Sequence, residues 1–294
     1  MRSYLYVPGD RPDRMTGALE RGADALILDL EDAVAPDNKV TAREHVSRFL
    51  ADVANRYDAA AAAASGPKFW VRINAGDMGL DDVAMVVPEG GAVLAGFVVP
   101  KVDSIDDLDE LSRELEILEA ANDRDDLPIP LCALLETADA IFDARDIALH
   151  PRVVRLAIGE ADLSAELGVE LTPGDERELL TARSMVVMAS AAARIDPPTG
   201  PVSTDFRDLD AYRASSVALL RLGFAGRSAI HPAQVPIINE VFTPSAADVE
   251  RARVQLAAFA AAGGGACVGP DGQMVDEATV RRARRLLGRA VSSS

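Results

Sequence analysis

Short apolar runs that alternate with helical patterns constrain the fold of this chain more than any other feature of its sequence. Eight such runs have the length and composition of β-strands: Ser3–Val7, Ala25–Leu30, Lys68–Ile73, Ala95–Pro100, Leu131–Glu136, Val153–Gly159, Ala193–Pro198 and Phe224–Ile230. The runs ALILDL and LCALLE are nearly continuously apolar, which is typical of parallel strands buried on both faces. Eight strands alternating with helices favour an α/β fold of the TIM (β/α)8 barrel type over a doubly wound sheet, which would give a similar pattern.

Helical patterns lie between these runs. The clearest begins near Ser104, its predicted N-cap, and has leucines at helical spacing at positions 108, 111, 115 and 118. Another starts at Asp208 and is ended by Gly223 in a C-cap position. The alanine tract Ala59–Pro67 is interpreted as a helix end that runs into a loop.

The chain continues well beyond the eighth run. A helix is predicted from about Ser245 to Ala262, followed by the glycine-rich segment Gly263–Gln273 and a basic helix, VDEATVRRARRLLGR. A barrel needs none of these. The sequence therefore predicts a barrel domain over residues 1–240 and a C-terminal helical extension over residues 241–294, which can reach over a pocket or act as a lid over a neighbouring subunit.

Composition argues against several classes of partner. Asp and Glu number 47 against 30 Lys and Arg, and the formal net charge of −17 opposes binding to nucleic acids and anionic membranes. The two cysteines, Cys132 and Cys267, form neither a disulfide framework nor a CxxC metal pattern. No apolar run approaches the roughly 20 residues of a membrane span, and no signal peptide is evident. The sequence thus predicts a cytoplasmic protein without nucleic-acid or membrane partners.

Polar side chains follow several of the runs at their carboxyl ends, where the active site of a parallel barrel lies. In chain order they are Asp29, Glu31, Asp32, Arg72, Asn74, Lys101, Glu136, Glu160 and Asp162. A carboxylate that closes an apolar strand, as Glu136 does, is costly to bury unless a cation or hydrogen bonds compensate it. Mg²⁺ prefers oxygen ligands and commonly takes one or two protein carboxylates, so Glu136 and Asp162 are candidate ligands. A metal-free salt bridge to Arg72 or Lys101 is the alternative.

Arg72 lies in the motif WVRINA, which directs its guanidinium toward the predicted pocket. From spacing alone, it could equally pair with the acids or bind substrate. Beside a metal ion, it could stabilise an enolate oxygen, the charge that develops when a carbon–carbon bond next to a carbonyl is made or broken. The motifs of serine hydrolases, dinucleotide enzymes and P-loop NTPases are missing from the sequence. A Schiff-base aldolase that uses Lys101 stays open as an alternative.

Seven motifs in order resemble the citrate lyase β-subunit-like proteins, the group of the aldolase/citrate lyase superfamily that includes malyl-CoA and citramalyl-CoA lyases. They run from about Ser3 to Ile238 and are SYLYVPGDRPDRM, GADALILDLEDAVAPDNKVTAREHV, WVRINA, LLET, AIGEADLSAELG, VSTDFRD and GFAGRSAIHPAQV. The resemblance implies a TIM barrel that binds Mg²⁺. It also implies the making or cleavage of a carbon–carbon bond between an acyl-CoA and a 2-oxo acid such as glyoxylate, pyruvate or oxaloacetate.

The resemblance also implies roles for individual residues. Glu136 and Asp162 would ligate Mg²⁺, and Arg72 would bind the oxo-acid carbonyl and stabilise the enolate. Backbone amides of Gly159, Glu160 and Ala161 would hold the oxo-acid carboxylate. Asp276, in the motif MVD, would be the acid/base, delivered by the C-terminal segment of an adjacent subunit in a homo-oligomer, a trimer or a hexamer. The proline that usually follows this motif in the family is replaced by EATV.

The remaining acids and bases have supporting roles in this interpretation. Asp29, Glu31 and Asp32 would form a second shell that orients metal-bound water or Arg72. Coenzyme A requires basic anchors, for which Arg11, Arg14 and Lys39 are the candidates. Three alternative functions share the fold: a malyl-CoA thioesterase or malate synthase-like enzyme, a pyruvate-class aldolase that needs no CoA, and an accessory β subunit of a citrate lyase complex.

Overall fold

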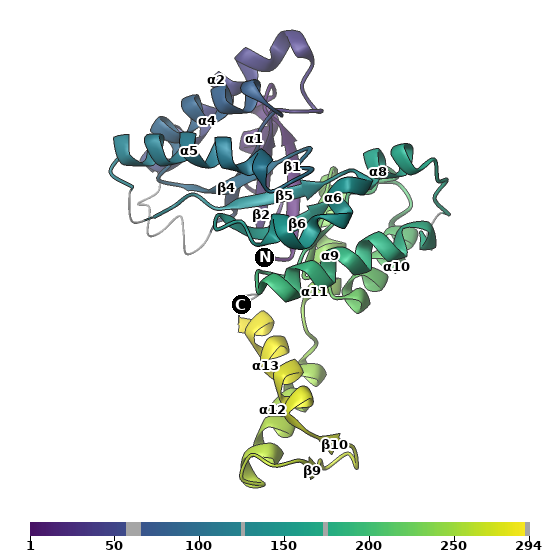
Figure 1. The fold of residues 1–294 in the computed structure, drawn as a ribbon. Helices are drawn as coiled ribbons and strands as arrows, with labels where there is room; N and C mark the ends of the chain where they lie inside the picture. Colours follow the sequence, from purple (N-terminus) through teal and green to yellow (C-terminus); the bar gives the residue numbers. More distant parts are fainter. Residues whose placement is uncertain (57–65, 125–126, 173–175, 292–294) are drawn as a thin grey trace. The chain divides into compact units, whose positions relative to one another are not determined.

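The computed structural model of the protein describes residues 1–56, 66–124, 127–172 and 176–291. Most of the alanine tract, residues 59–65, lies outside these ranges, so its interpretation stays a prediction. Eight parallel strands close into a barrel, which confirms the predicted TIM-type fold (Figure 1). The strands are β1 (Ser3–Pro8), β2 (Ala25–Asp29), β3 (Lys68–Arg72), β4 (Leu94–Val99), β5 (Leu131–Leu135), β6 (Val153–Ile158), β7 (Thr199–Gly200) and β8 (Gly226–Ala229).

Strand β7 lies elsewhere than the sequence predicts. The predicted run Ala193–Pro198 is a connection, and the two-residue strand Thr199–Gly200 follows it. Proline has no N–H group to give to a ladder, so Pro197 and Pro198 cannot continue a central strand. The preceding helix ends at Arg194, which takes a left-handed conformation with φ 63°.

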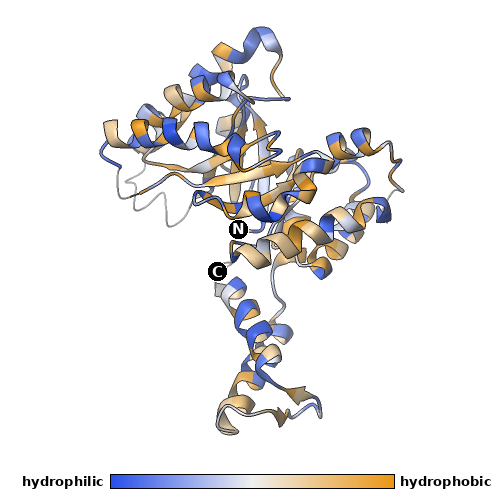
Figure 2. Cartoon of the chain, in the orientation of Figure 1, coloured by the Kyte–Doolittle hydropathy of each residue, from blue (hydrophilic) through white to orange (hydrophobic). Residues whose placement is uncertain are grey.

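Helices surround the barrel and connect its strands. They are α1 (Pro12–Ala18), α2 (Lys39–Arg56), α4 (Asp77–Gly90), α5 (Asp106–Ala121), α6 (Ala138–Phe142), α7 (Ala144–Ala148), α8 (Glu160–Leu167), α9 (Leu180–Ala193), α10 (Leu209–Leu222) and α11 (Val235–Phe242). Helices α2, α4 and α5 pack side by side in Figure 1. Figure 2 shows hydrophilic and hydrophobic residues interleaved along the helices, as expected of helices with one face on a core.

Two helix ends test the predicted caps. Gly223 ends α10 with φ 115°, which confirms its predicted C-cap position, and Asp208, the predicted first residue, is the N-cap and accepts a hydrogen bond from the backbone N–H of Ala211. The prediction of Ser104 as the N-cap of α5 is wrong, because the residue before this helix is Ile105, which makes no side-chain cap. The carboxylate of Asp107, in the first turn of the helix, accepts a hydrogen bond from the N–H of Ser104 at 2.8 Å and so stabilises the segment that precedes the helix.

The interior of the barrel is packed mainly with aliphatic side chains, together with Tyr4 and Trp70. Its buried cluster consists of Tyr4, Ala25, Ile27, Trp70, Val98, Cys132, Leu134 and Ala157. Burial raises the pKa of the Cys132 thiol to about 12, so this cysteine stays protonated and is a poor nucleophile.

Strand register determines which polar side chains meet at the carboxyl edge of the barrel. Pro8 of β1 pairs with Asp29 of β2, and Asp29 pairs in turn with Arg72 of β3. The adjacent strands β5 and β6 end at Leu135 and Ile158, which are also register partners. Residues that follow these five strands therefore gather at one mouth of the barrel.

Residues from Glu240 onward form a second compact unit, to which Met1 also belongs, while Arg2–Asn239 form the barrel unit. The second unit contains α12 (Ala246–Ala261), the antiparallel pair β9 (Cys267–Val268) and β10 (Met274–Val275), and α13 (Glu277–Val291). Helices α12 and α13 pack on each other. The proposed action of this extension as a lid stays a prediction. Within the described ranges, no helix is both long and apolar enough to cross a membrane.

Candidate active site

Asp29 and Arg72 form a buried bidentate ion pair at the mouth of the barrel. The Nε and Nη2 atoms of Arg72 donate to the two carboxylate oxygens of Asp29 at 2.7 and 2.6 Å. The same carboxylate accepts the backbone N–H groups of Glu31 at 2.9 Å and Ala33 at 3.2 Å. Asp29 therefore holds the guanidinium of Arg72 and the loop after β2 in one arrangement.

The other acids after β2 surround the same guanidinium. Glu31 lies 2.8 Å from Nη1 of Arg72 and 3.1 Å from Nζ of Lys101. Asp32 accepts a longer bond of 3.3 Å from Nη1 of Arg72. Burial raises the pKa of Glu31 although both cations oppose the shift. These three carboxylates thus hold two cations at the edge of the cavity.

Lys101 is a poor candidate for a Schiff-base nucleophile. Its hydrogen bond to Glu31 and the nearby negative charge raise the pKa of the Lys101 ammonium. A nucleophilic lysine needs a depressed pKa, so this environment disfavours the Schiff-base alternative.

Glu136 follows β5 and is 4% exposed. Its Oε2 accepts a 3.3 Å hydrogen bond from the backbone N–H of Lys101, a residue in the left-handed region with φ 54°. Gly159 lies against it so closely that a Cβ atom there would be 2.5 Å from Cγ of Glu136. Burial, followed by repulsion from Glu31 and Asp162, raises the pKa of Glu136 to about 7.

Helix α8 presents the motif GEAD to the site. Gly159 is the N-cap, Glu160 is the first helical residue, and Asp162 stands in the first turn with its side chain exposed. The carboxylate of Glu160 is bound at both oxygens by Arg183 of α9, at 2.5 and 2.6 Å. Of the two acids in this motif, Asp162 is therefore the one whose carboxylate is open to the cavity.

These residues line a cavity of about 400 Å³. Its charged members are Arg14, Asp29, Asp32, Arg72, Glu136, Glu160 and Asp162. Leu134, Val202 and Ile230 contribute apolar wall. A small polar molecule with an apolar portion would fill such a space.

The carboxylates of this cavity suit Mg²⁺ better than a softer metal. Glu136 and Asp162 offer oxygen donors only, and their mutual repulsion contributes to the raised pKa of Glu136. Among the described residues, no group of three or more His, Cys, Asp and Glu side chains is arranged to enclose a metal. Mg²⁺ is usually held by one or two carboxylates with water and substrate oxygens, so the residues present fit this ion.

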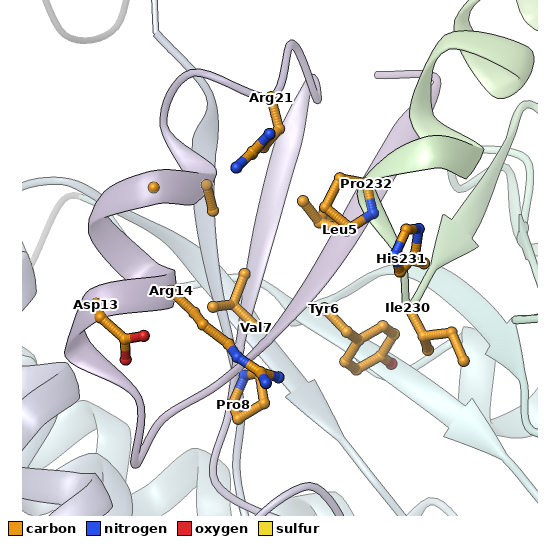
Figure 3. Close-up of a pocket in the computed structure, with 12 residues that line it drawn as sticks. Leu5, Tyr6, Val7, Pro8, Asp13, Arg14, Arg21, Ile230, His231 and Pro232 are labelled. Atoms are coloured by element: carbon orange, nitrogen blue, oxygen red, sulfur yellow. The ribbon is translucent and has the colours of Figure 1, made fainter. Parts of the chain in front are cut away.

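A second cavity, of about 440 Å³, lies beside α1 (Figure 3). Its basic lining residues are Arg14, Arg21 and His231, and Arg14 lines the first cavity as well. In Figure 3 the guanidinium of Arg14 extends from α1 toward β1. Arg21 and His231 were not among the predicted site residues, although the position of His231 directly after the eighth predicted run was a usable signal.

The three predicted CoA anchors have different surroundings. Arg11 is exposed and forms an ion pair with Asp13 at 3.0 Å. The ammonium of Lys39 donates to the backbone carbonyls of Leu30 at 2.8 Å and Glu31 at 2.6 Å, and so stabilises the loop after β2. Arg14 alone among the three lines both cavities. A role for any of them toward CoA stays a prediction.

Asp276 caps α13 in the C-terminal unit. Its Oδ1 accepts hydrogen bonds from the N–H of Thr279 at 2.8 Å and from its hydroxyl at 2.9 Å. These bonds lower the pKa of Asp276. Its predicted part as an acid/base stays a prediction.

The fold and this cavity define a (β/α)8-barrel protein of the kind whose catalytic groups follow the barrel strands. Residues 2–232 match the family model described as HpcH/HpaI aldolase/citrate lyase. The chain belongs to this family, which confirms the resemblance seen in the sequence motifs.

Individual relatives cover nearly the whole chain. A (3S)-malyl-CoA thioesterase from Cereibacter sphaeroides is 36% identical, covering 98% of this chain and 94% of the relative. An L-malyl-CoA/beta-methylmalyl-CoA lyase from Rhodobacter capsulatus is 32% identical over the same shares. The solved structure of CitE from Mycobacterium tuberculosis, in complex with magnesium, acetoacetate and coenzyme A, is 28% identical with a TM-score of 0.71, covering 99% of this chain and 98% of CitE.

Proposed function

We propose that this protein is a Mg²⁺-dependent carbon–carbon lyase that acts on a 3-hydroxyacyl-CoA, such as malyl-CoA or citramalyl-CoA. It would form or cleave this thioester from an acyl-CoA and a 2-oxo acid: glyoxylate, pyruvate or oxaloacetate. The observation that carries the proposal is the presence of Glu136 and Asp162 in one cavity with Arg72, where burial, followed by repulsion from Glu31 and Asp162, raises the pKa of Glu136 to about 7. A divalent cation would relieve that repulsion. The names of the malyl-CoA relatives support the choice of substrate.

The cavity residues divide the chemistry between them. Mg²⁺ held by Glu136 and Asp162 would supply a Lewis acid that polarises the oxo-acid carbonyl. Arg72, oriented by its two hydrogen bonds to Asp29, would donate to the oxygen on which negative charge develops. Because Asp29 fixes this donor before substrate binds, little reorganisation is needed during the reaction.

The two ends of the substrate would be held by other groups. The backbone amides of Gly159, Glu160 and Ala161, at the start of α8, would bind the oxo-acid carboxylate, since a helix N-terminus favours an anion. During cleavage the substrate hydroxyl would give its proton to water, the bond between its carbon and the thioester α-carbon would break, and the electron pair would form an enolate. Asp276, protonated from solvent, would then give that proton to the α-carbon and return to the carboxylate form that its lowered pKa favours.

Coenzyme A would enter through the cavity beside α1. Its phosphates require positive charge, which a chain of net charge −17 can offer only locally. Arg14 and Arg21 supply such a locality, and Arg14 also lines the cavity that contains Glu136 and Asp162. A thioester whose phosphates occupy the α1 cavity would therefore lie with its acyl end near Glu136 and Asp162.

Thioester hydrolysis is the second candidate, favoured by the 36% identity to a (3S)-malyl-CoA thioesterase. The purified protein should be incubated with (3S)-malyl-CoA and Mg²⁺ and the products identified by mass. We expect acetyl-CoA and glyoxylate; malate with free CoA would instead establish the thioesterase. EDTA should stop either reaction, and turnover that persists in EDTA would refute the metal assignment. No turnover by the purified chain would favour an accessory subunit.

A subunit-mixing experiment tests whether Asp276 acts on a neighbouring barrel. Asp276→Asn and Glu136→Gln should each be inactive alone. When the two variants are co-expressed and form mixed homo-oligomers, we expect about a quarter of wild-type activity to return. Random assembly places a barrel with Glu136 next to a C-terminal segment with Asp276 at about one interface in four. Recovery would be measured against each variant mixed with itself. A purely monomeric protein, or no recovery in verified mixed oligomers, would contradict action across subunits.

A further inference from the structure

Arg183 binds the motif GEAD from behind the cavity. It projects from α9 and is 2% exposed, although its helix is otherwise rich in alanine, valine and methionine. Its Nε and Nη2 atoms donate to the two oxygens of Glu160, which is 8% exposed. The Nη2 atom also donates to Glu176 at 2.6 Å. One buried guanidinium thus joins three segments: α8, α9 and the loop that precedes α9.

The place of Glu160 makes this ion pair relevant to the site. It is the first residue of α8, directly after Gly159, whose backbone lies against Glu136, and two residues before Asp162. A rigid helical turn connects these positions, so holding the carboxylate of Glu160 also sets where Asp162 leaves the helix. The amides of Glu160 and Ala161 belong to the same turn. Outer groups that orient metal ligands usually act in this way.

We propose that Arg183 is a positioning residue for the Mg²⁺ site, which acts through Glu160 to aim Asp162 and the first amides of α8 into the cavity. This inference rests on the function proposed above. In this proposal Glu160 orients the start of α8 without contacting the ion, and Glu136 and Asp162 are the carboxylates that contact it.

The chain offers a matched control. Arg152 and Glu119 form another buried bidentate pair in the barrel unit, with bonds of 2.7 and 2.8 Å. Arg152 is 8% and Glu119 is 4% exposed, so the pair resembles Arg183–Glu160 in geometry and burial. Neither residue lines the cavity that contains Glu136 and Asp162. Loss of either ion pair should therefore lower the stability of the fold by a similar amount. Only loss of the Arg183–Glu160 pair should weaken metal binding.

The test measures Mn²⁺ binding, as a stand-in for Mg²⁺, by electron paramagnetic resonance on the full-length purified protein. In Arg183→Lys we expect the Kd for Mn²⁺ to rise about 10-fold, the lower end of the usual effect of an outer-shell change. Arg152→Lys should lose comparable thermal stability and keep its Kd within about twofold. Glu160→Gln, which keeps the shape of the side chain, provides the same test should Arg183→Lys not fold, and its Kd should rise by a similar factor.

The outcomes separate the two proposals. If Asp162→Asn binds Mn²⁺ as the wild type does, the proposed metal site is wrong, whatever Arg183 does. If Asp162→Asn loses binding while the folded Arg183 and Glu160 variants keep the wild-type Kd, only the positioning role is overturned. If Glu160→Gln loses binding as completely as Asp162→Asn, Glu160 is itself a ligand and the inference is also overturned.

Discussion

Replacement of Glu136 by glutamine is expected to abolish Mg²⁺-dependent turnover and, at the same time, to stabilise the metal-free protein above pH 7. Glutamine removes the negative charge that the ion requires, so we expect turnover to fall by at least about a thousandfold, the scale on which loss of a major electrostatic contact acts. The gain in stability follows from the surroundings of Glu136, which is buried and repelled by Glu31 and Asp162.

The sign of the stability change follows from proton linkage. The pKa of Glu136 lies at about 7 in the folded protein and near its ordinary value of 4.5 in the unfolded chain, so between these values the folded state binds more protons. The contribution of Glu136 to stability is therefore full below pH 4.5 and is lost as the pH rises to 7. A shift of this size is equivalent to about 3 kcal/mol at most. Glutamine is neutral throughout, so its advantage should appear at pH 8 and vanish near pH 4.

Urea unfolding of the metal-free wild type and Glu136→Gln at pH 4, 6 and 8 measures this difference. Glu119→Gln is the matched control, since Glu119 is equally buried but forms an ion pair with Arg152, and its loss should destabilise the protein. Adding Mg²⁺ at pH 8 should stabilise the wild type and leave Glu136→Gln nearly unchanged. A glutamine variant less stable than the wild type at pH 8 would show that Glu136 is not an uncompensated charge.

Replacement of Arg72 by methionine is expected to remove activity and to destabilise the fold by about 3–5 kcal/mol, because Asp29 would keep a buried charge without its counter-ion and Glu31 would keep only Lys101. Turnover should fall about 100- to 1000-fold through loss of a donor to the developing oxyanion. Initial rates with (3S)-malyl-CoA and urea unfolding at pH 7 would measure the two effects.

A second substitution separates these two roles of Arg72. In the double variant Arg72→Met with Asp29→Asn, the buried charge that has lost its counter-ion is removed, so most of the stability should return while the activity stays lost. If activity returned together with stability, Arg72 would serve the fold alone and its part in the proposed reaction would be wrong. Arg72→Lys, which keeps the charge but not the fork of donors, should retain more stability than activity.

Much of the fold was predictable because local periodicity and barrel geometry agree. Seven of the eight strands lie where apolar runs predict them, since a parallel strand buried on both faces needs such a run. The eighth, β7, has only two residues and leaves almost no periodic signal. The acids after β2, β5 and β6 were found by the same logic, because polar residues that follow barrel strands meet at one mouth.

The sequence by itself determined the barrel, the gathering of acids and Arg72 at its mouth, and the family, because these depend on strand periodicity and short local motifs. Only the tertiary structure decided how the acids are divided. Asp29 pairs with Arg72 and Glu160 with Arg183, whereas the carboxylate of Glu136 has no ion-pair partner among the residues that the structure describes. An ion pair depends on distances of a few ångströms between helices and loops far apart in the chain. Nothing in the local pattern around Arg183 encodes the neighbour that α9 brings to it.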